Sequence, residues 1–222
     1  MPRAHDDTVD TLDPDDAVGQ RTPRTRNRRG QGAELRNELI AAASRLLEDL
    51  GGEAALTLRA VAREAGVAAP SIYLHFAELH QLVDAVLESR FGVLRELIND
   101  AANGSATPAD ELRARARAYC QFAADHPGNY RVMFTAVPIA PRACAIEDLP
   151  GARIVLELAA CIGRCAQSGA TPPFDALTSA TLLWTTLHGI VSLRVSKPAF
   201  PWAPTDELVD RALLALCAIP LP

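Results

Sequence analysis

Five side chains between residues 68 and 76 are of types that suit contact with a DNA groove. They are Ala69, Pro70, Ser71, Tyr73 and His75. The first three are small, so a helix that carries them can bring its backbone close to the edges of the bases. The phenol and the imidazole have polar tips that suit phosphate oxygens, and such contacts fix the register of a protein on the duplex. The chemistry that this segment offers is therefore recognition of double-stranded DNA.

Two short helices around a tight turn are needed to position these side chains. Thr57 can cap the first helix with its hydroxyl. Apolar residues then recur on one helical face: Leu58, Val61, Ala62 and Ala65. Gly66 can end that helix, because glycine adopts the left-handed conformation without a side-chain penalty. Pro70 falls in the first turn of the second helix, where its missing N–H costs nothing. With Ile72 and Phe76 on the inner face, the pattern predicts a helix-turn-helix.

The wider sequence resembles a known family. Helical corners with a glycine are common in all-helical proteins, so the segment alone leaves that alternative open. An amphipathic helix over 35–50, two glycines, the run L-T-L-R-A-V-A-R-E-A-G-V and the run S-I-Y-L-H-F follow one another. Together they resemble the DNA-binding domain of the tetracycline-repressor (TetR) family over residues 33–85. The resemblance implies a palindromic double-stranded DNA operator, a homodimer and an unknown small-molecule effector.

One position departs from the family pattern. The family commonly has a Pro-Ser-Lys-Glu run after the Tyr-x-x-Phe element, and its lysine contacts a phosphate. This chain has the run A-E-L-H, so Leu79 stands at the lysine position and His80 follows it. We expect the phosphate contact to be missing and His80 to be solvated. Thr57 and Arg59, at the start of the first short helix, complete the predicted DNA contacts of the domain.

The charge of the chain is unevenly distributed. The formal net charge is −5, yet residues 21–65 hold nine arginines against six acidic residues. Residues 1–20 are acidic, with six aspartates and one arginine. The local charge, not the total, sets the field at a binding face. The arginine-rich arm that ends in Arg28 and Arg29 has almost no apolar residue and is predicted to be disordered. We expect it to contact phosphates or the minor groove. A solvated tail is the alternative.

The composition predicts an all-α fold. The chain of 222 residues is long enough for a small domain and a larger one. Hydrophobic residues make up 49% of it and aromatic residues only 5%, so Ala and Leu favour closely packed helices. We predict a disordered arm over 1–32, a helix-turn-helix domain over 33–80, and a helical regulatory and dimerisation domain over 81–222.

Helix signals continue through the C-terminal domain. Helices are predicted over 78–101 and 107–124, from residue 126 onward, and over 149–167, 174–196 and 205–218, with a loop over 137–150. Thr107 caps the second of these in a capping-box pattern. In the helix over 174–196, apolar residues recur at spacings of three and four: Leu177, Ala180, Trp184, Leu187, Val191 and Val195. The resemblance implies that the last two helices pair with a second subunit, although a monomer core could use them too.

Six residues are candidates for an effector pocket: Phe122, Tyr130, Met133, Phe134, Trp184 and His188. The run L-W-T-T-L-H-G resembles the Trp-His-Gly motif of one C-terminal subclass of the family. Trp184 and His188 share a helix face, and Gly189 allows a neighbour to approach. They would offer an effector apolar area and a hydrogen bond. Packing or a dimer contact is the alternative role of the motif, and we favour that architectural interpretation.

These features favour a ligand-responsive transcriptional regulator, most simply a repressor that a small molecule releases from its operator. A small shift between two recognition helices breaks their simultaneous docking on half-sites at fixed spacing. An activator remains an open alternative. An enzyme with an incidental helical corner is disfavoured, because the sequence has no nucleophile-elbow, zinc-protease or nucleotide-binding glycine motif. A helical protein-interaction adaptor would show an exposed apolar patch and no DNA binding.

No cofactor or metal site is predicted. The chain has five cysteines, and this odd number in a chain expected to be intracellular predicts reduced thiols. Cys161 and Cys165 share a helix face, as a metal or redox pair would, but buried core thiols are the favoured interpretation. The polar N-terminus lacks a secretory signal, and no apolar run reaches the ~18 residues of a membrane span. We therefore expect a cytoplasmic protein without membrane association.

Overall fold

The computed structural model of the chain describes residues 32–50, 56–135, 149–172 and 175–221. The helices in these ranges are α1 (Gly32–Leu50), α2 (Leu58–Glu64), α3 (Ala69–Tyr73), α4 (Leu79–Ala102), α5 (Pro108–Asp125), α6 (Pro127–Thr135), α7 (Ala152–Gln167), α8 (Ala176–Ser196) and α9 (Thr205–Cys217). The described residues contain no strand, so the all-α prediction is confirmed. Arg28, Arg29 and most of the predicted loop over 137–150 fall outside the described residues.

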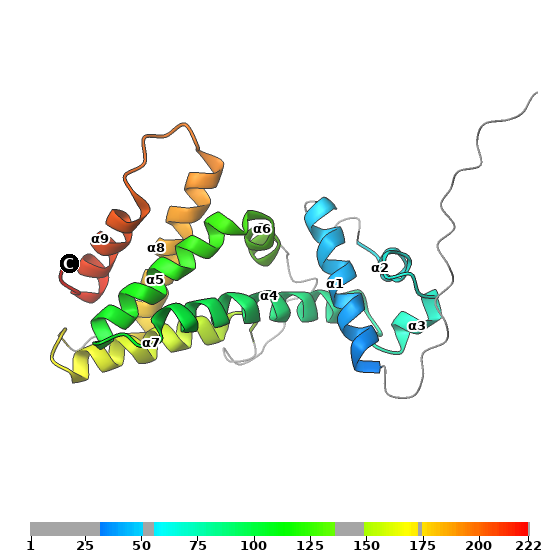
Figure 1. Cartoon of the computed structure of the whole chain (residues 1–222), viewed down its shortest axis with the longest axis horizontal. Helices are drawn as coiled ribbons and strands as arrows, with labels where there is room; N and C mark the ends of the chain where they lie inside the picture. The colour runs from blue at the N-terminus through cyan, green and yellow to red at the C-terminus, as the bar shows by residue number, and fades with distance from the viewer. Residues whose placement is uncertain (1–31, 51–55, 136–148, 173–174, 222) are drawn as a thin grey trace, which may run out of the picture.

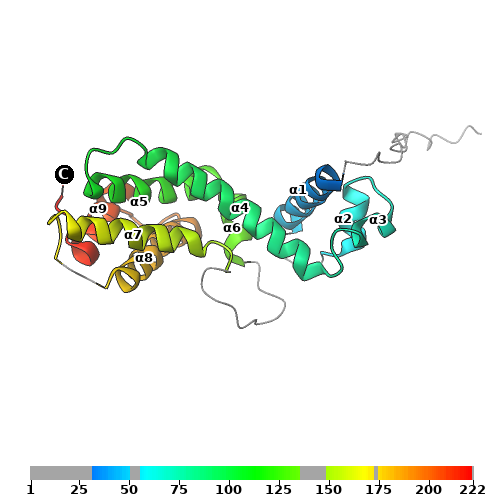
Figure 2. The same ribbon diagram turned by 90° about the horizontal axis from the view of Figure 1, so that it is seen from below.

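The molecule is elongated. Helices α1–α3 form one end, and α5 with α7–α9 form the body at the other end (Figure 1). Helix α4 runs from one end into the other, and α6 lies beside it between the two (Figure 2). This arrangement means that α4 and α6 are the structural connections between the helix-turn-helix and the body.

The N-cap, the turn glycine and the first-turn proline of the helix-turn-helix are found where the sequence predicts them. The Thr57 hydroxyl accepts a hydrogen bond from the Ala60 amide at 3.1 Å, which confirms the N-cap of α2. Gly66 has a φ of +71°, in the left-handed region that a tight turn requires of it. Pro70 lies in the first turn of α3. Ile72 and Phe76 are buried and hold α3 against the neighbouring helices.

Two hydrophobic cores meet on α4. The first core packs α1–α3 against the first half of α4, up to Leu87. The second core begins at Leu94 on α4 and includes buried residues of α5 and α7–α9. Phe91, between those two positions, packs against both cores. Val132 of α6 belongs to the core of the helix-turn-helix although its helix leads into the body.

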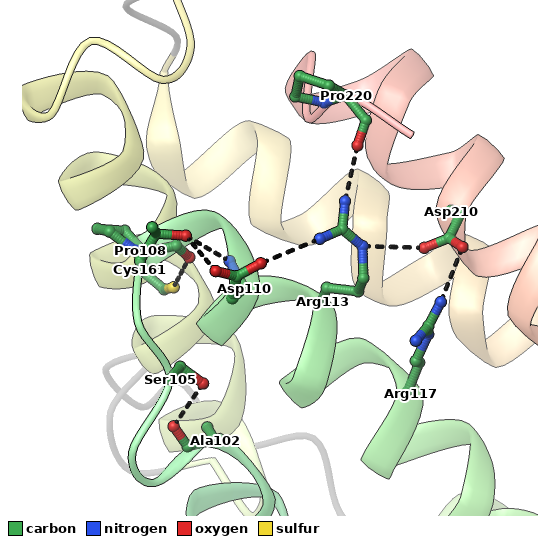
Figure 3. Close-up of polar contacts among 10 residues, drawn as sticks. Ala102, Ser105, Pro108, Asp110, Arg113, Arg117, Cys161, Asp210 and Pro220 are labelled. Carbon is green, nitrogen blue, oxygen red and sulfur yellow. Dashed lines mark hydrogen bonds and ion pairs between the residues drawn. The ribbon is translucent and has the colours of Figure 1, made fainter. Parts of the chain in front are cut away.

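A buried carboxylate fastens α9 to α5 (Figure 3). Asp210 accepts a hydrogen bond from Arg113 Nε at 3.1 Å and another from Arg117 Nη2 at 2.8 Å. Arg113 also donates to the carbonyl of Pro220 at 2.7 Å, just beyond the end of α9. Near the start of α5, Thr107 accepts from the amide of Asp110, which confirms that cap. These bonds tie α9 and the residues that follow it to α5, which lies at the centre of the body.

The predicted inner face of α8 is wrong at both of its ends. Leu177 and Val195 are 41% and 65% exposed, whereas Leu183, which the predicted stripe omitted, is fully buried. Helix α8 is apolar on nearly all sides, so spacing alone did not identify its inner face. By length and composition alone, α8 is the one described helix that could cross a membrane, as can the core helix of a soluble protein. In this structure it packs against α5, α7 and α9.

Candidate functional site

The predicted DNA contacts of α3 lie at the end of the molecule away from the body, as both views show (Figure 1; Figure 2). Tyr73 is half exposed and Pro70 is exposed. Ala69, Ser71 and His75 are partly buried. Helix α3 therefore exposes a phenol and a proline at the surface, while its isoleucine is buried. On α2, the Thr57 hydroxyl is engaged in its cap, and its residue remains exposed together with Arg59.

Two residues next to α3 have surroundings that the sequence did not predict. Leu74, which sequence reasoning did not single out, is 84% exposed beside Tyr73. His80 is not simply solvated, because its Nδ1 lies 3.0 Å from Glu78 Oε2 and its side chain is 29% exposed. Glu78 is also the N-cap of α4 and forms a capping box with Gln81. The region that carries a phosphate-binding lysine in the family therefore serves here to begin α4.

In the body, a chain of hydrogen bonds runs through the candidate effector residues. The hydroxyls of Tyr119 and Tyr130 are 2.9 Å apart, and the Tyr130 hydroxyl lies 2.6 Å from Nδ1 of His188. The other ring nitrogen of His188 lies 3.2 Å from the Ser192 hydroxyl. Burial raises the pKa of Tyr130 to about 12 and lowers the pKa of His188. The network is therefore uncharged at neutral pH, and it joins α5, α6 and α8.

An apolar cavity of about 200 Å³ lies beside this network, and Trp184 forms part of its wall. We call it the Trp184 cavity. Its walls come from α4, α5, α7 and α8 and from the residues that lead into α7: Phe91, Tyr119, Leu149, Pro150, Gly151, Ala152, Ile154, Val155, Thr181 and Trp184. A polar hollow of about 280 Å³ shares Phe91, Leu149, Gly151 and Ile154 with the cavity. Arg153 lines this second space, which we call the Arg153 hollow.

Trp184 and His188 face different spaces although they share a face of α8. His188 lines a groove of about 450 Å³ together with Tyr130 and Phe134, and Trp184 does not. The Phe134 ring lies next to both, with its centroid 4.5 Å from that of His188 and 6.4 Å from that of Trp184. Three of the six candidates therefore line this groove, and Trp184 lines the cavity.

Phe122 and Met133 lie in the packed core. Each is 4% exposed, and neither lines the cavity, the hollow or the groove. Sequence reasoning missed Phe91 and Tyr119, which do line the cavity. Tyr119 carried one signal, since it is one of three tyrosines in the chain and a tyrosine on an apolar helix face needs a partner for its hydroxyl. Phe91 carried none, because nothing in its spacing sets it apart on α4.

The structure also places Gly189 of α8 and the two free cysteines of α7. Apart from its chain neighbours and the backbone of its own helix, no atom of the described residues lies within 4 Å of a Cβ built on Gly189, so its predicted neighbour is not supplied by this part of the same chain. Cys161 and Cys165 are fully buried in the body core, as expected of core thiols. Cys161 lies within hydrogen-bond distance of the carbonyl of Pro108, at 3.5 Å.

The two ends of the molecule are joined by polar contacts as well as by packing. Arg90 of α4 donates to the Ser44 hydroxyl of α1 at 2.8 Å and forms an ion pair with Glu48. Arg131 of α6 donates to the backbone carbonyl of Glu48 at 2.7 Å. These bonds hold both α4 and α6 to α1, so both helices connect the body to the helix-turn-helix.

Comparison with known proteins agrees with this arrangement. Residues 39–86 match the family described as "Bacterial regulatory proteins, tetR family". Residues 112–216, which include the Trp-His-Gly motif, match "Tetracyclin repressor-like, C-terminal domain". A protein with unknown function from Rhodococcus sp. RHA1 is 30% identical, with a TM-score of 0.68 over 83% of this chain and 94% of that chain.

Two further solved structures share the fold at lower identity. One is a putative tetR family transcription regulator from Shewanella sp. PV-4, 15% identical with a TM-score of 0.65 over 83% of this chain and 96% of that one. The other is FadR from Bacillus subtilis in complex with stearoyl-CoA, 17% identical with a TM-score of 0.64 over 82% and 97%. The matches at both ends of the chain, together with its helix-turn-helix, establish the family. The chain belongs to the tetR family of bacterial regulatory proteins.

Proposed function

We propose that the chain is a cytoplasmic, dimeric transcriptional repressor that leaves a palindromic operator when a small molecule occupies the Trp184 cavity. The observation that carries this proposal is the position of Phe91. Its side chain lines the cavity and packs against both hydrophobic cores. A ligand that moves Phe91 therefore acts directly on α4, whose first residues follow the recognition helix α3.

Helix α6 supplies a second connection. Tyr130 is hydrogen-bonded to His188 in the body, while Val132, two residues later, is buried in the core of the helix-turn-helix. Both ring nitrogens of His188 have partners within the chain. We therefore assign His188 a positioning role, in which it holds α6 through Tyr130, rather than a direct contact with the effector.

Release follows from geometry. Two recognition helices must reach successive major grooves at a fixed spacing, so a change in the angle of α4 in each subunit prevents simultaneous docking. A full switch from 1:99 to 99:1 needs a ligand that prefers one form by about 5.5 kcal/mol. Contacts with the wall of an apolar cavity can provide such a difference in affinity. A ligand ring that is buried in only one of the two protein conformations gains the free energy of transfer from water in that conformation alone.

A second copy of the chain fits the outer face of α8. Leu182, Thr186, Gly189 and Leu193 follow at spacings of four, three and four, which places them along one stripe of the helix. Leu182 and Leu193 are both 49% exposed. A stripe with a glycine at its middle allows a second helix to approach closely. On α9, Leu214 is 42% exposed and adds to the apolar surface.

A single experiment tests both DNA binding and dimerisation. The wild-type chain, Gly189→Leu and Gly163→Leu are compared by light scattering and by titration against a DNA fragment from around the chain's own gene. Gly163 of α7 is the matched control. A Cβ at this position also has no described atom of another helix within 4 Å, but α7 does not carry the proposed interface. We expect Gly189→Leu to lose the dimer and operator binding together, and Gly163→Leu to keep both. A dimeric Gly189→Leu that binds operator normally would contradict the proposed interface.

The salt dependence of wild-type binding completes the test. Binding through phosphate contacts weakens linearly on a plot of log K against log salt. Failure to bind any fragment at low salt would contradict the proposed repressor function. It would favour the alternative of a helical protein-interaction adaptor.

A further inference from the structure

We infer that the effector is a small, uncharged hydrophobic molecule built around about one ring. It binds in the Trp184 cavity, with at most a neutral polar substituent in the Arg153 hollow. This inference rests on the proposed function, because it identifies the chemical class of the molecule that releases the operator.

The size of the cavity sets the first limit. Its volume is about 200 Å³, whereas sites for drug-sized ligands span roughly 300–1,000 Å³. An apolar cavity of about 150 Å³ is sufficient for benzene. The Trp184 cavity therefore fits a single ring with one or two small substituents, and it does not fit a long acyl chain.

The chemistry of the walls sets the second limit. Phe91, Ile154 and Trp184 give the cavity an apolar surface. The two side-chain hydroxyls in the wall already have partners. Tyr119 is hydrogen-bonded to Tyr130 at 2.9 Å, and Thr181 donates to a backbone carbonyl of its own helix at 2.9 Å. A charged group placed in this cavity would lose its hydration without gaining an ionic partner, which is costly.

The ionisation state of the wall agrees with this limit. Burial raises the pKa of Tyr119 far above its usual range, so its phenol stays protonated at physiological pH. Among the described residues that line the cavity there is no Asp, Glu, Lys, Arg or His. The described wall thus offers a ligand ring surfaces and aliphatic groups, and no charge.

The Arg153 hollow does not select a charged ligand either. Glu88, Arg95 and Arg153 line it. Arg95 forms an ion pair with Glu157, whose carboxylate lies 2.6 Å from its guanidinium. The remaining lining charges, on Glu88 and Arg153, have opposite signs and are both exposed. A hydroxyl or another neutral polar group can hydrogen-bond to either of them, whereas an anion or a cation gains from one and is repelled by the other.

The test uses the full chain and four matched compounds: toluene, benzyl alcohol, benzoate and benzylamine. They share one ring and differ in charge. Stearoyl-CoA is the large, charged comparison. Binding of each is measured by calorimetry without DNA, and operator release is measured separately. We expect toluene and benzyl alcohol to bind, with benzoate and benzylamine weaker by on the order of 100-fold because a charge would be desolvated.

A cavity-filling variant locates the site. Val155→Trp places an indole in the Trp184 cavity, and Val93→Trp is the control, because Val93 is 49% exposed on α4 and does not line the cavity. We expect Val155→Trp to lose toluene binding while Val93→Trp keeps it. If Val155→Trp does not fold, the comparison of the four compounds on the wild-type chain still tests whether the site prefers an uncharged ligand.

Four results would overturn the inference. They are tighter binding of benzoate or benzylamine than of toluene, binding of stearoyl-CoA alone, undiminished toluene binding by a folded Val155→Trp, and no binding of any uncharged ring. Failure of the proposed function gives a different result, since a chain that binds toluene but no operator has the ligand site without the regulatory role. A chain that binds operator but none of the uncharged rings keeps the proposed function and refutes this ligand class.

Discussion

Gly151 and Phe91 lie so close together that a Cβ on Gly151 would be 2.5 Å from Cε1 of the Phe91 ring. Gly151 is the N-cap of α7 and has a φ of +80°, a conformation that side chains disfavour. The glycine is thus required both by the backbone and by the space that the ring occupies. It allows α7 to begin directly against α4, and it keeps Phe91 in the wall of the Trp184 cavity.

Gly151→Ala is expected to displace Phe91 and to lower the free energy of unfolding by about 1–3 kcal/mol. The displaced ring should also weaken the response of operator binding to the effector. Urea denaturation and an operator-release assay measure the two effects. Gly163→Ala on the same helix is the control, because its Cβ meets no atom within 4 Å and alanine favours a helix by up to about 1 kcal/mol. Equal behaviour of the two variants would contradict the tight contact at Gly151.

Tyr73→Ala is expected to weaken operator binding without unfolding the protein, since the side chain is half exposed on α3. A lost phosphate hydrogen bond of about 1 kcal/mol corresponds to a roughly fivefold change in Kd. Tyr73→Phe removes only the hydroxyl and should show most of that loss. Fluorescence anisotropy on an operator fragment gives Kd, and circular dichroism checks the helicity. Unchanged affinity in both variants would remove Tyr73 from the DNA contacts.

Deletion of residues 1–30 is expected to lower operator affinity and to flatten the dependence of log K on log salt, because fewer counterions are released. Deletion of residues 1–20 alone should leave the affinity equal or raised, since that segment holds six aspartates and one arginine. The two truncations are compared by the same salt titration. If they behave alike, the arginines of the arm make no contact with DNA.

Asp210→Ala is expected to destabilise the body by about 2–4 kcal/mol, because it leaves Arg113, whose side chain is 14% exposed, with only the longer 3.4 Å contact to the exposed Asp110 carboxylate. Glu207→Ala, one turn earlier on α9, is the control. Glu207 pairs with Arg211 at 3.7 Å on the surface, and such a pair contributes at most about 0.5 kcal/mol. Urea denaturation followed by circular dichroism measures both. A small effect of Asp210→Ala would mean that apolar packing alone holds α9.

Protonation of His188 is expected to destabilise the folded chain. Burial lowers the pKa of His188 in the folded state below its unfolded value of about 6.5. The unfolded chain therefore binds the proton more readily, and the free energy of unfolding falls as the pH drops below about 6.5 until the folded pKa is passed. His188→Gln should reduce this fall. Urea denaturation at pH 8, 7, 6 and 5.5 measures it, and an identical pH dependence in the variant would exclude His188 as its source.

The features that sequence reasoning predicted well are those set within a few residues. The Thr57 cap, the left-handed Gly66 and the place of Pro70 each depend on local backbone chemistry, and all three are found in the structure. Their spacing carried the family resemblance, which the comparisons confirm. The helix-turn-helix could therefore be predicted in some detail.

The features that sequence reasoning missed depend on contacts between distant helices. The inner face of α8 could not be read from spacing, because apolar residues such as Leu177 and Val195 also occur on its exposed side. The walls of the Trp184 cavity come from four helices and the lead into α7, so no single segment marks Phe91 or Tyr119 as cavity residues. Phe122 illustrates the same limit, since a core aromatic and a pocket aromatic look alike in a sequence.

Because the single helix α4 contributes to both hydrophobic cores, we expect the unfolding of the two ends of the molecule to be coupled. The helix-turn-helix cannot lose its core without unravelling the first half of α4, and the second half is held in the body. A molecule that stabilises the body then also makes opening of the DNA-binding end rarer. Amide hydrogen exchange in α2 and α3 should accordingly slow when the body is occupied, at residues that never touch the bound molecule.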